Sequence, residues 1–434
     1  MIRRRTATLG LFGLLAACSH KHDVITGVQI PVLPDKSGMG VSVNAPAVTL
    51  PPAKALRAWP QPLANPAHVP GNAAGPLGFK PGWQVDIGAG GGYRRPLVSS
   101  PVVAAGHVFT MDADAHVRAI SLTDGTTLWH TQTRPHHVST QNLGGGIVYD
   151  SGKIFVSTGF AEALALDAAT GKILWRQSLD FPARSAPLVA GGLVAIIVQN
   201  DWLLTFNAES GSLGWRFSGS VGTPPMTAVS VVGAPAYADG ILVAGFSAGM
   251  LAAIDTNSGT PVWEQSLAAG FGQASSLDLS DVVASPIIAG GVVYALNLDG
   301  TFMAVDLHSG AKVWTHGASG SQAPAASGGF LFLLDAKATL YAIHADDGLV
   351  SWATALPLYK NEKKKKKPIA WTGPVLVNGM LVAVSDYGEA VLVDARTGRV
   401  QSTVKLDAPA DVAPLAVNGM LLQLTRNARL TAYV

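Results

Sequence analysis

The chain has 434 residues, of which 48% are hydrophobic and 13% are charged. A sequence this apolar can bury a large core, which excludes a mostly disordered chain. After Cys18 the chain holds 27 basic and 28 acidic residues, a net charge of −1, and this near-neutral balance argues against bulk binding of nucleic acid.

Residues 1–17 have the pattern of an export signal. Three arginines at positions 3–5 precede an apolar run over residues 9–15, which is too short to span a membrane. Cys18 follows in the sequence "LAAC" and is the only cysteine of the chain, so no disulfide can form within it. We expect Cys18 to be acylated as in a bacterial lipoprotein, and Ser19 after it is typical of the form directed to the outer membrane. The remainder would then face the periplasm, held by acyl chains.

Residues 18–75 are predicted to be the lipid anchor followed by a flexible tether. The segment is rich in Pro, Ala and Gly and shows no sustained hydrophobic period. Local docking near Trp59 is left open.

A ten-residue phrase then recurs seven times, as in "LDAATGKILW" at residues 166–175. Its glycine returns every 38 to 51 residues, which is the period of a repeat fold. The glycines are Gly125, Gly171, Gly211, Gly259, Gly310, Gly348 and Gly398. Four residues later stand Trp129, Trp175, Trp215, Trp263, Trp314, Trp352 and, in the seventh copy, Ser402. The glycine is expected to supply a positive φ in a turn, and the tryptophan to begin the next strand.

A second phrase precedes each copy and is typical of a β-hairpin, as in "SAPLVAGGLV". A third short run leads into the glycine turn, so each unit contains four strands and resembles a propeller blade. An eighth hairpin phrase is followed only by "RLTAYV", whereas "PGWQVDIG" near residue 83 has a tryptophan but no blade of its own. The sequence therefore predicts an all-β, eight-bladed propeller over residues 76–434, with the strand around Trp83 completing the last blade.

The tryptophans are interpreted as wedges between neighbouring blades, each with its indole N–H bonded to a backbone carbonyl. A stacking platform for nucleobases or sugars is the alternative interpretation.

The units resemble a known superfamily at this point. Ala165, Asp167, Thr170–Lys172 and Trp175 match the motif A-x-D-x-x-T-G-K-x-x-W of quinoprotein-like propellers, which include enzymes and non-enzymes. Within that superfamily the whole chain resembles the BamB family, lipoproteins of the machinery that assembles outer-membrane β-barrels. The resemblance implies a non-enzymatic scaffold without a cofactor that binds the POTRA domains of BamA, beside other lipoproteins of the complex. Binding of unfolded outer-membrane proteins by edge pairing is a weaker expectation.

The resemblance also implies where the partner binds. An L-S-D-V-D contact of the family corresponds to residues 279–283 here, and an L-S-L-R-G contact corresponds to residues 229–233. The predicted BamA-binding residues are Val229, Val231, Val232, Asp281 and Val283. The second acid of the first motif and the arginine of the second are absent, which leaves their salt bridges open.

Five consecutive lysines, Lys363–Lys367, interrupt the repeat after Trp352. A run of like charges repels itself, so a solvated loop is expected. Contact with anionic lipid head groups or with an acidic partner is the alternative.

Two other function classes stay open: a quinone-dependent dehydrogenase and a lipoprotein scaffold of another envelope complex. Enzymes of the first class usually carry a vicinal cysteine pair, and this chain has neither such a pair nor a C-x-x-C-H motif. Asp112, Asp114 and His116 alternate as metal ligands can, but they fall at a hairpin turn and are interpreted as turn residues. His136 and His137 are adjacent and would point to opposite faces of a strand. No catalytic, cofactor-binding or metal-binding residue is predicted.

Overall fold

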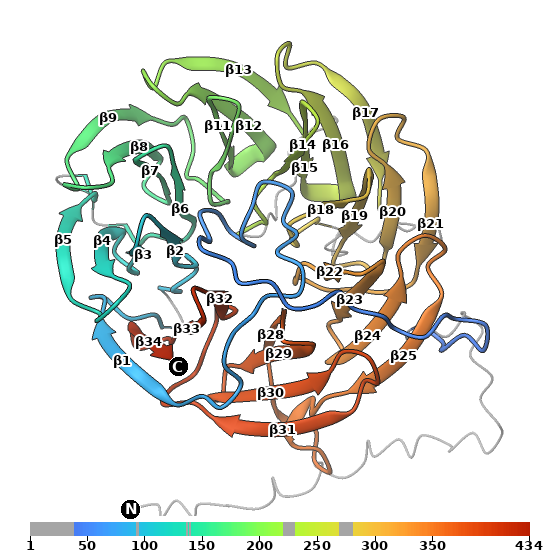
Figure 1. Ribbon diagram of the computed structural model, residues 1–434. Helices are drawn as coiled ribbons and strands as arrows, with labels where there is room; N and C mark the ends of the chain where they lie inside the picture. Colours follow the sequence, from blue (N-terminus) through green and yellow to red (C-terminus); the bar gives the residue numbers. More distant parts are fainter. Residues whose placement is uncertain (1–38, 93–94, 136–137, 139, 220–230, 269–280) are drawn as a thin grey trace, which may run out of the picture. The chain divides into compact units, whose positions relative to one another are not determined.

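The computed structural model describes residues 39–92, 95–135, 138, 140–219, 231–268 and 281–434. These residues belong to one compact unit that begins at residue 38. Figure 1 shows a ring of eight blades around a central axis. Each blade is a four-stranded antiparallel sheet, which confirms the predicted propeller. Within the described ranges, no helix is both long and apolar enough to span a bilayer.

The first four blades follow one another along the chain. Blade 1 contains β2 (Val102–Ala104), β3 (His107–Met111), β4 (His116–Ser121) and β5 (Thr127–Gln132). Blade 2 contains β6 (Gly145–Asp150), β7 (Lys153–Thr158), β8 (Glu162–Asp167) and β9 (Ile173–Ser178). Blade 3 contains β10 (Leu188–Ala190), β11 (Leu193–Val198), β12 (Trp202–Asn207) and β13 (Leu213–Ser218). Blade 4 contains β14 (Ala236–Ala238), β15 (Ile241–Gly245), β16 (Met250–Asp255) and β17 (Pro261–Ser266).

The second half repeats the pattern with one insertion. Blade 5 contains β18 (Ile287–Ala289), β19 (Val292–Leu296), β20 (Phe302–Asp306) and β21 (Lys312–His316). Blade 6 contains β22 (Ala325–Ser327), β23 (Phe330–Leu334), β24 (Thr339–His344) and β25 (Val350–Ala355). A hairpin of β26 (Tyr359–Asn361) and β27 (Lys366–Pro368) precedes blade 7. Blade 7 contains β28 (Trp371–Val377), β29 (Met380–Ser385), β30 (Glu389–Asp394) and β31 (Val400–Lys405).

Blade 8 joins the two ends of the ring. Its strands are β32 (Leu415–Val417), β33 (Met420–Leu424), β34 (Arg429–Tyr433) and β1 (Pro81–Asp86). β1 pairs antiparallel with β34, so that Trp83 lies opposite Ala432 and Asp86 opposite Arg429. The last blade is therefore closed by an N-terminal strand, as the spare tryptophan predicted.

Burial follows the position of a strand within its blade. The second strand of a blade is buried on both faces, as in β11, because a neighbouring blade packs on each side. The outermost strand alternates between exposed and partly buried residues, as in β5, because only one of its faces contacts a neighbour. The core consequently lies in the seams between blades, in clusters that each draw on neighbouring blades.

Residues 39–75 lie against the ring, which corrects the expectation of a flexible tether over this part of 18–75. Figure 1 shows this segment, here called the strap, crossing the middle of the ring. Trp59 is 3% exposed, and its backbone exchanges two hydrogen bonds with Val103 of β2. The tether prediction failed because the strap has no regular period, and its partners are backbone groups that the closed ring brings together.

The strap makes a hydrogen bond to every blade. Its bonds to blades 1 to 4 join Trp59 to Val103, Pro60 to Tyr149, Gln61 to Val189 and Pro66 to Tyr237. Its bonds to blades 5 to 8 join Ala67 to Ile288, Ser42 to Val350, Ala73 to Leu376 and Leu56 to Asn418. Most of these partners lie on one face of the ring, near the turn that connects the first strand of a blade to its second strand.

Candidate functional site

The repeated tryptophans fix each blade to the next. Every predicted tryptophan donates its indole N–H to a carbonyl of the following blade, at 2.7 to 3.2 Å. The pairs are Trp83 to Leu122, Trp129 to Ala168, Trp175 to Ala208, Trp215 to Thr256, Trp263 to Leu307, Trp314 to Ala345 and Trp352 to Ala395. Every indole takes part in the same contact between neighbouring blades. The repeated tryptophans therefore hold the blades together and do not form a shared binding surface.

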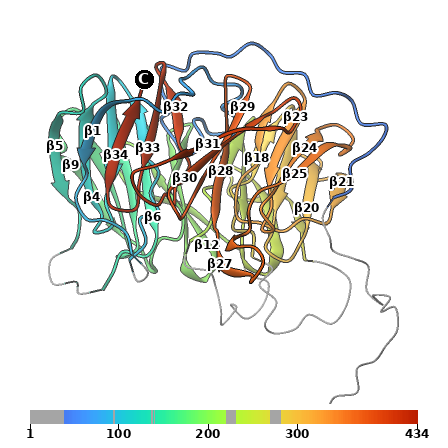
Figure 2. The ribbon, with the colours of Figure 1, turned by 90° about the horizontal axis from the view of Figure 1, so that it is seen from below.

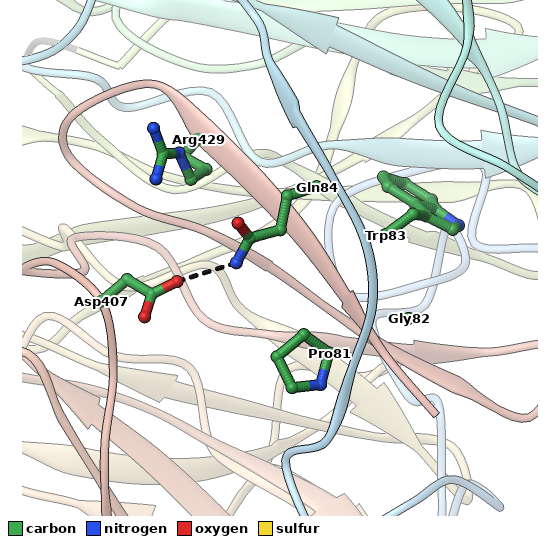
Figure 3. A pocket seen from close by; sticks show the side chains of 6 residues that line it. All are labelled: Pro81, Gly82, Trp83, Gln84, Asp407 and Arg429. Atoms are coloured by element: carbon green, nitrogen blue, oxygen red, sulfur yellow. Dashed lines mark hydrogen bonds between the residues drawn. The ribbon is translucent and has the colours of Figure 1, made fainter.

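The seam between blades 7 and 8 lacks this contact. The outer strand of blade 7 carries Ser402, and blade 8 has no glycine turn because its two outer strands come from opposite ends of the chain. A shallow hollow of about 660 Å³ lies at this seam, lined by Pro81, Gly82, Trp83, Gln84, Asp407 and Arg429. Figure 3 shows Gln84 extending toward Asp407, to which its amide donates a 2.8 Å hydrogen bond, with Trp83 on the other side of β1. The hollow is open and does not bring together a nucleophile and a base.

The turns between the second and third strands differ among the blades. In six blades, a polar residue stands at the end of the second strand or directly after it. Its side chain closes the turn by a hydrogen bond to the backbone of the residue four positions later. These residues are Asp112, Thr158, Asn297, Asp335, Ser385 and Thr425. Blades 3 and 4 have the apolar residues Val198 and Phe246 there, followed by 3-10 turns at Gln199–Asp201 and Ser247–Gly249. The polar side chains of Asp201 and Ser247 in these two 3-10 turns are therefore available for another contact.

That contact is a buried cluster of Arg184, Asp201, Ser247 and Asp281, here called the Arg184 network. The Arg184 guanidinium donates to Asp201 at 2.8 Å and to Asp281 at 3.4 Å. The Ser247 hydroxyl lies 3.0 Å from Asp201 and 3.4 Å from Asp281. Arg184 is 2% exposed and Asp281 3% exposed. Removing one partner of such a buried group typically costs about 3–5 kcal/mol, because a charge is left unpaired.

The network joins three blades at one face of the ring. Arg184 precedes β10 of blade 3, Ser247 lies between β15 and β16 of blade 4, and Asp281 precedes β18 of blade 5. The turns between second and third strands lie on the same face of the ring as the connections from one blade to the next. The strap lies on the opposite face. Arg184 also accepts a bond from the Val232 amide through its own carbonyl, at 3.1 Å.

The two segments that the resemblance singled out lie side by side. The Gly233 amide donates to the Val283 carbonyl at 2.7 Å, and the Val282 amide donates to the Phe246 carbonyl at 3.1 Å. A Cβ on Gly233 would lie 2.2 Å from the Ser285 amide nitrogen, so only glycine permits this approach. Backbone close packing and the Arg184 network therefore hold residues 231–233 and 281–283 as one unit.

The predicted partner-binding residues divide into three groups. Val231 and Val283 are partly exposed, and Val232 and Asp281 are buried. Val229 lies outside the described residues, as do Ser230, Leu279 and Ser280. The Asp281 carboxylate faces Arg184, which differs from the expectation of a carboxylate presented to the partner. Arg184, Asp201 and Ser247 were missed because no sequence spacing relates an arginine to an acid 97 residues away.

Asp112, Asp114 and His116 form a turn, as interpreted from the sequence. One oxygen of Asp112 accepts the backbone amides of Asp114 and His116, each at 2.9 Å. Among the described residues there is no group of three or more His, Cys, Asp and Glu arranged to hold a metal ion. Cys18, His136 and His137 lie outside those residues.

Comparison with known proteins identifies the family. The model of the family described as outer membrane protein assembly factor BamB matches residues 81–143 and 135–354. The BamB protein of Yersinia pestis is 27% identical over 360 residues, which cover 81% of this chain and 88% of that protein. That of Escherichia coli K12 is 27% identical over 346 residues, covering 78% and 85%.

Solved structures support the fold. The crystal structure of BamB from Moraxella catarrhalis superposes with a TM-score of 0.67 at 17% identity, covering 81% of this chain and 99% of that one. A europium-containing methanol dehydrogenase reaches 0.68 at 15% identity, covering 84% and 89%. Shape alone therefore does not separate assembly factors from quinoprotein enzymes, whereas the sequence match does. The chain belongs to the family of the outer membrane protein assembly factor BamB.

Proposed function

We propose that this protein is a non-enzymatic scaffold for the assembly of β-barrel proteins in the outer membrane, and that it binds the POTRA domains of BamA. The family match over residues 81–354 supports the first part. Acylation of Cys18, with the ring facing the periplasm, belongs to the same proposal and rests on the sequence of residues 1–18.

The observation that carries the partner site is the pairing of residues 231–233 with residues 281–283. Two segments from different blades present partly exposed valines, Val231 and Val283, on a support of buried charges. Apolar side chains at the centre of a contact, held by rigid backbone, are typical of protein interfaces. The function assigned to Asp281 in this arrangement is to hold the segment in place through Arg184.

The test is capture of BamA from detergent-solubilised envelopes with a tag placed after Val434. We expect Val283→Asp to reduce the BamA recovered at least tenfold, because it places a charge at the apolar contact. Val98→Asp is the matched control: Val98 stands three residues before Pro101 of blade 1, as Val283 stands three before Pro286 of blade 5, and both are partly exposed.

Equal recovery of BamA by the two variants, with matching thermal melts, would show that this surface does not bind the partner. Recovery of a different envelope component by the unaltered protein would favour the alternative scaffold.

A further inference from the structure

The hairpin between blades 6 and 7 is a structured projection. Tyr359 pairs with Pro368 and Asn361 pairs with Lys366, forming the only two-stranded sheet in the described part of the chain. Its base is fixed, because Ile369 and Trp371 are buried and the Trp371 indole donates to the Pro357 carbonyl at 2.8 Å. Figure 2 shows β27 at the face of the ring opposite the strap. The lysine run is therefore held on a rigid support.

The lysine charges at the tip are not neutralised locally. The only acid of the turn, Glu362, accepts the backbone amides of Leu358 and Tyr359 at 2.8 and 2.9 Å. Asn361 accepts the Lys364 amide at 3.0 Å, so the side chains of Glu362 and Asn361 shape the turn by bonding to backbone amides and not to the lysine ammonium groups. Lys363–Lys367 are all exposed, and none forms an ion pair with another described residue. Five positive charges thus lie within one short turn.

The backbone of the tip adds a second unfavourable contribution. Lys365 and Lys367 have φ values of +47° and +60°, in the left-handed region that glycine or asparagine occupies more easily. Lysines at these positions add both strain and mutual repulsion to the folded state. The feature that the five residues of the run share is their positive charge.

The residue type indicates the kind of ligand. Lysine is a strongly hydrated point charge, whereas specific recognition of patterned carboxylates typically uses the planar fork of arginine, which the hairpin lacks. Five exposed lysines on one short turn suit an extended anionic surface. We infer that the hairpin of residues 359–368 is a membrane contact that binds the head-group phosphates of anionic phospholipids.

The proposed lipid anchor would place such a surface within reach. Twenty residues lie between Cys18 and Met39, and an extended chain over that separation spans about 70 Å. A tethered cationic patch experiences a high local concentration of head groups, and an acyl anchor combined with a polybasic segment holds a protein more firmly than either signal alone. The inference uses the anchor part of the proposed function and is independent of BamA.

The experiment measures how accessible each lysine is in the membrane-bound protein. The full chain is reconstituted into vesicles of phosphatidylcholine or of an equimolar mixture with phosphatidylglycerol, and is treated with an amine-acetylating reagent. We expect modification of Lys363–Lys367 to fall at least fivefold in the anionic vesicles and to recover at high salt, but not on addition of inorganic phosphate at matched ionic strength. Lys172 and Lys312 are the controls, because they are exposed at the opposite end of the strands.

Equal modification in the two kinds of vesicle would overturn the inference. Protection that requires an added acidic protein would also overturn it and would assign the hairpin to a protein partner. Flotation of the chain with neutral vesicles reports the anchor separately. If the anchor fails, binding is scored by sedimentation with anionic vesicles, where Lys364→Glu with Lys366→Glu must abolish it.

Discussion

At the scale of single residues, the repeat glycines have two functions. Gly211 adopts φ +72°, and the ring of Trp175 from the preceding blade lies directly over it, so that a Cβ there would be 2.6 Å from the indole. The other six repeat glycines are covered by a tryptophan in the same way. The sequence predicted the positive φ but not the overlay. Ser402 follows from the same arrangement, because blade 8 offers no glycine turn for a tryptophan to cover.

Substituting two glycines separates these functions. Gly192 has φ +78° with open space around its hydrogen, so Gly192→Ala should lower the free energy of unfolding by about 1 kcal/mol through backbone strain alone. Gly211→Ala should cost about 2–4 kcal/mol, because Trp175 must also move. Denaturant unfolding of both variants measures the difference, and equal losses would argue against the tryptophan overlay.

At the scale of elements, the parts of the fold that could be predicted from the sequence were those with a regular repeat. The blades and the closing strand were predictable because their turn glycines and tryptophans recur at fixed offsets. The strap was not, since Pro60, Pro66 and Ala67 contribute backbone carbonyls whose partners exist only once the ring is closed. The Arg184 network has the same character, because a lone arginine does not indicate which blade supplies its acid.

The strap should make stability depend on pH through His68. Its Nδ1 donates to the Pro286 carbonyl at 2.8 Å, and Nε2 is buried without a partner among the described residues. Burial lowers the pKa of His68 from 6.5 to about 4, although the carbonyl bond opposes this shift. Unfolding therefore takes up a proton between about pH 6.5 and pH 4, and stability falls as pH falls through that window.

The expected loss at pH 5 relative to pH 8 is about 2 kcal/mol from this group. His68→Gln keeps a donor for Pro286 and removes the titration, so its free energy of unfolding should change less with pH than that of the unaltered protein. Parallel pH profiles for the two proteins would show that His68 does not titrate in this way.

At the scale of the whole molecule, ring closure depends on both ends of the chain. β34 is held between β33 and β1, so its removal leaves β1 without a partner strand and exposes one edge of β33. Propeller blades stabilise one another mainly through neighbouring seams, and a ring that is not closed loses the contacts of two seams.

A chain ending at Ala428 should therefore show no cooperative thermal transition. A chain lacking only Val434, which is 52% exposed, should lose about 1 kcal/mol or less. Calorimetry of the two shortened chains measures whether each unfolds in a cooperative thermal transition. A cooperative transition in the shorter chain would mean that blade 8 is dispensable.

The strap also determines how the ring responds to a mechanical load. A pull applied at Met39 first strains the bonds of Ser42 and Pro46 to β25 of blade 6. Beyond them the strap reaches blade 8 through Leu56, then blades 1 to 5 in order, and finally blade 7 through Ala73. Because successive bonds lie on different blades around the circumference, each bond that breaks transfers the load to another blade, and no single blade is peeled from its neighbours.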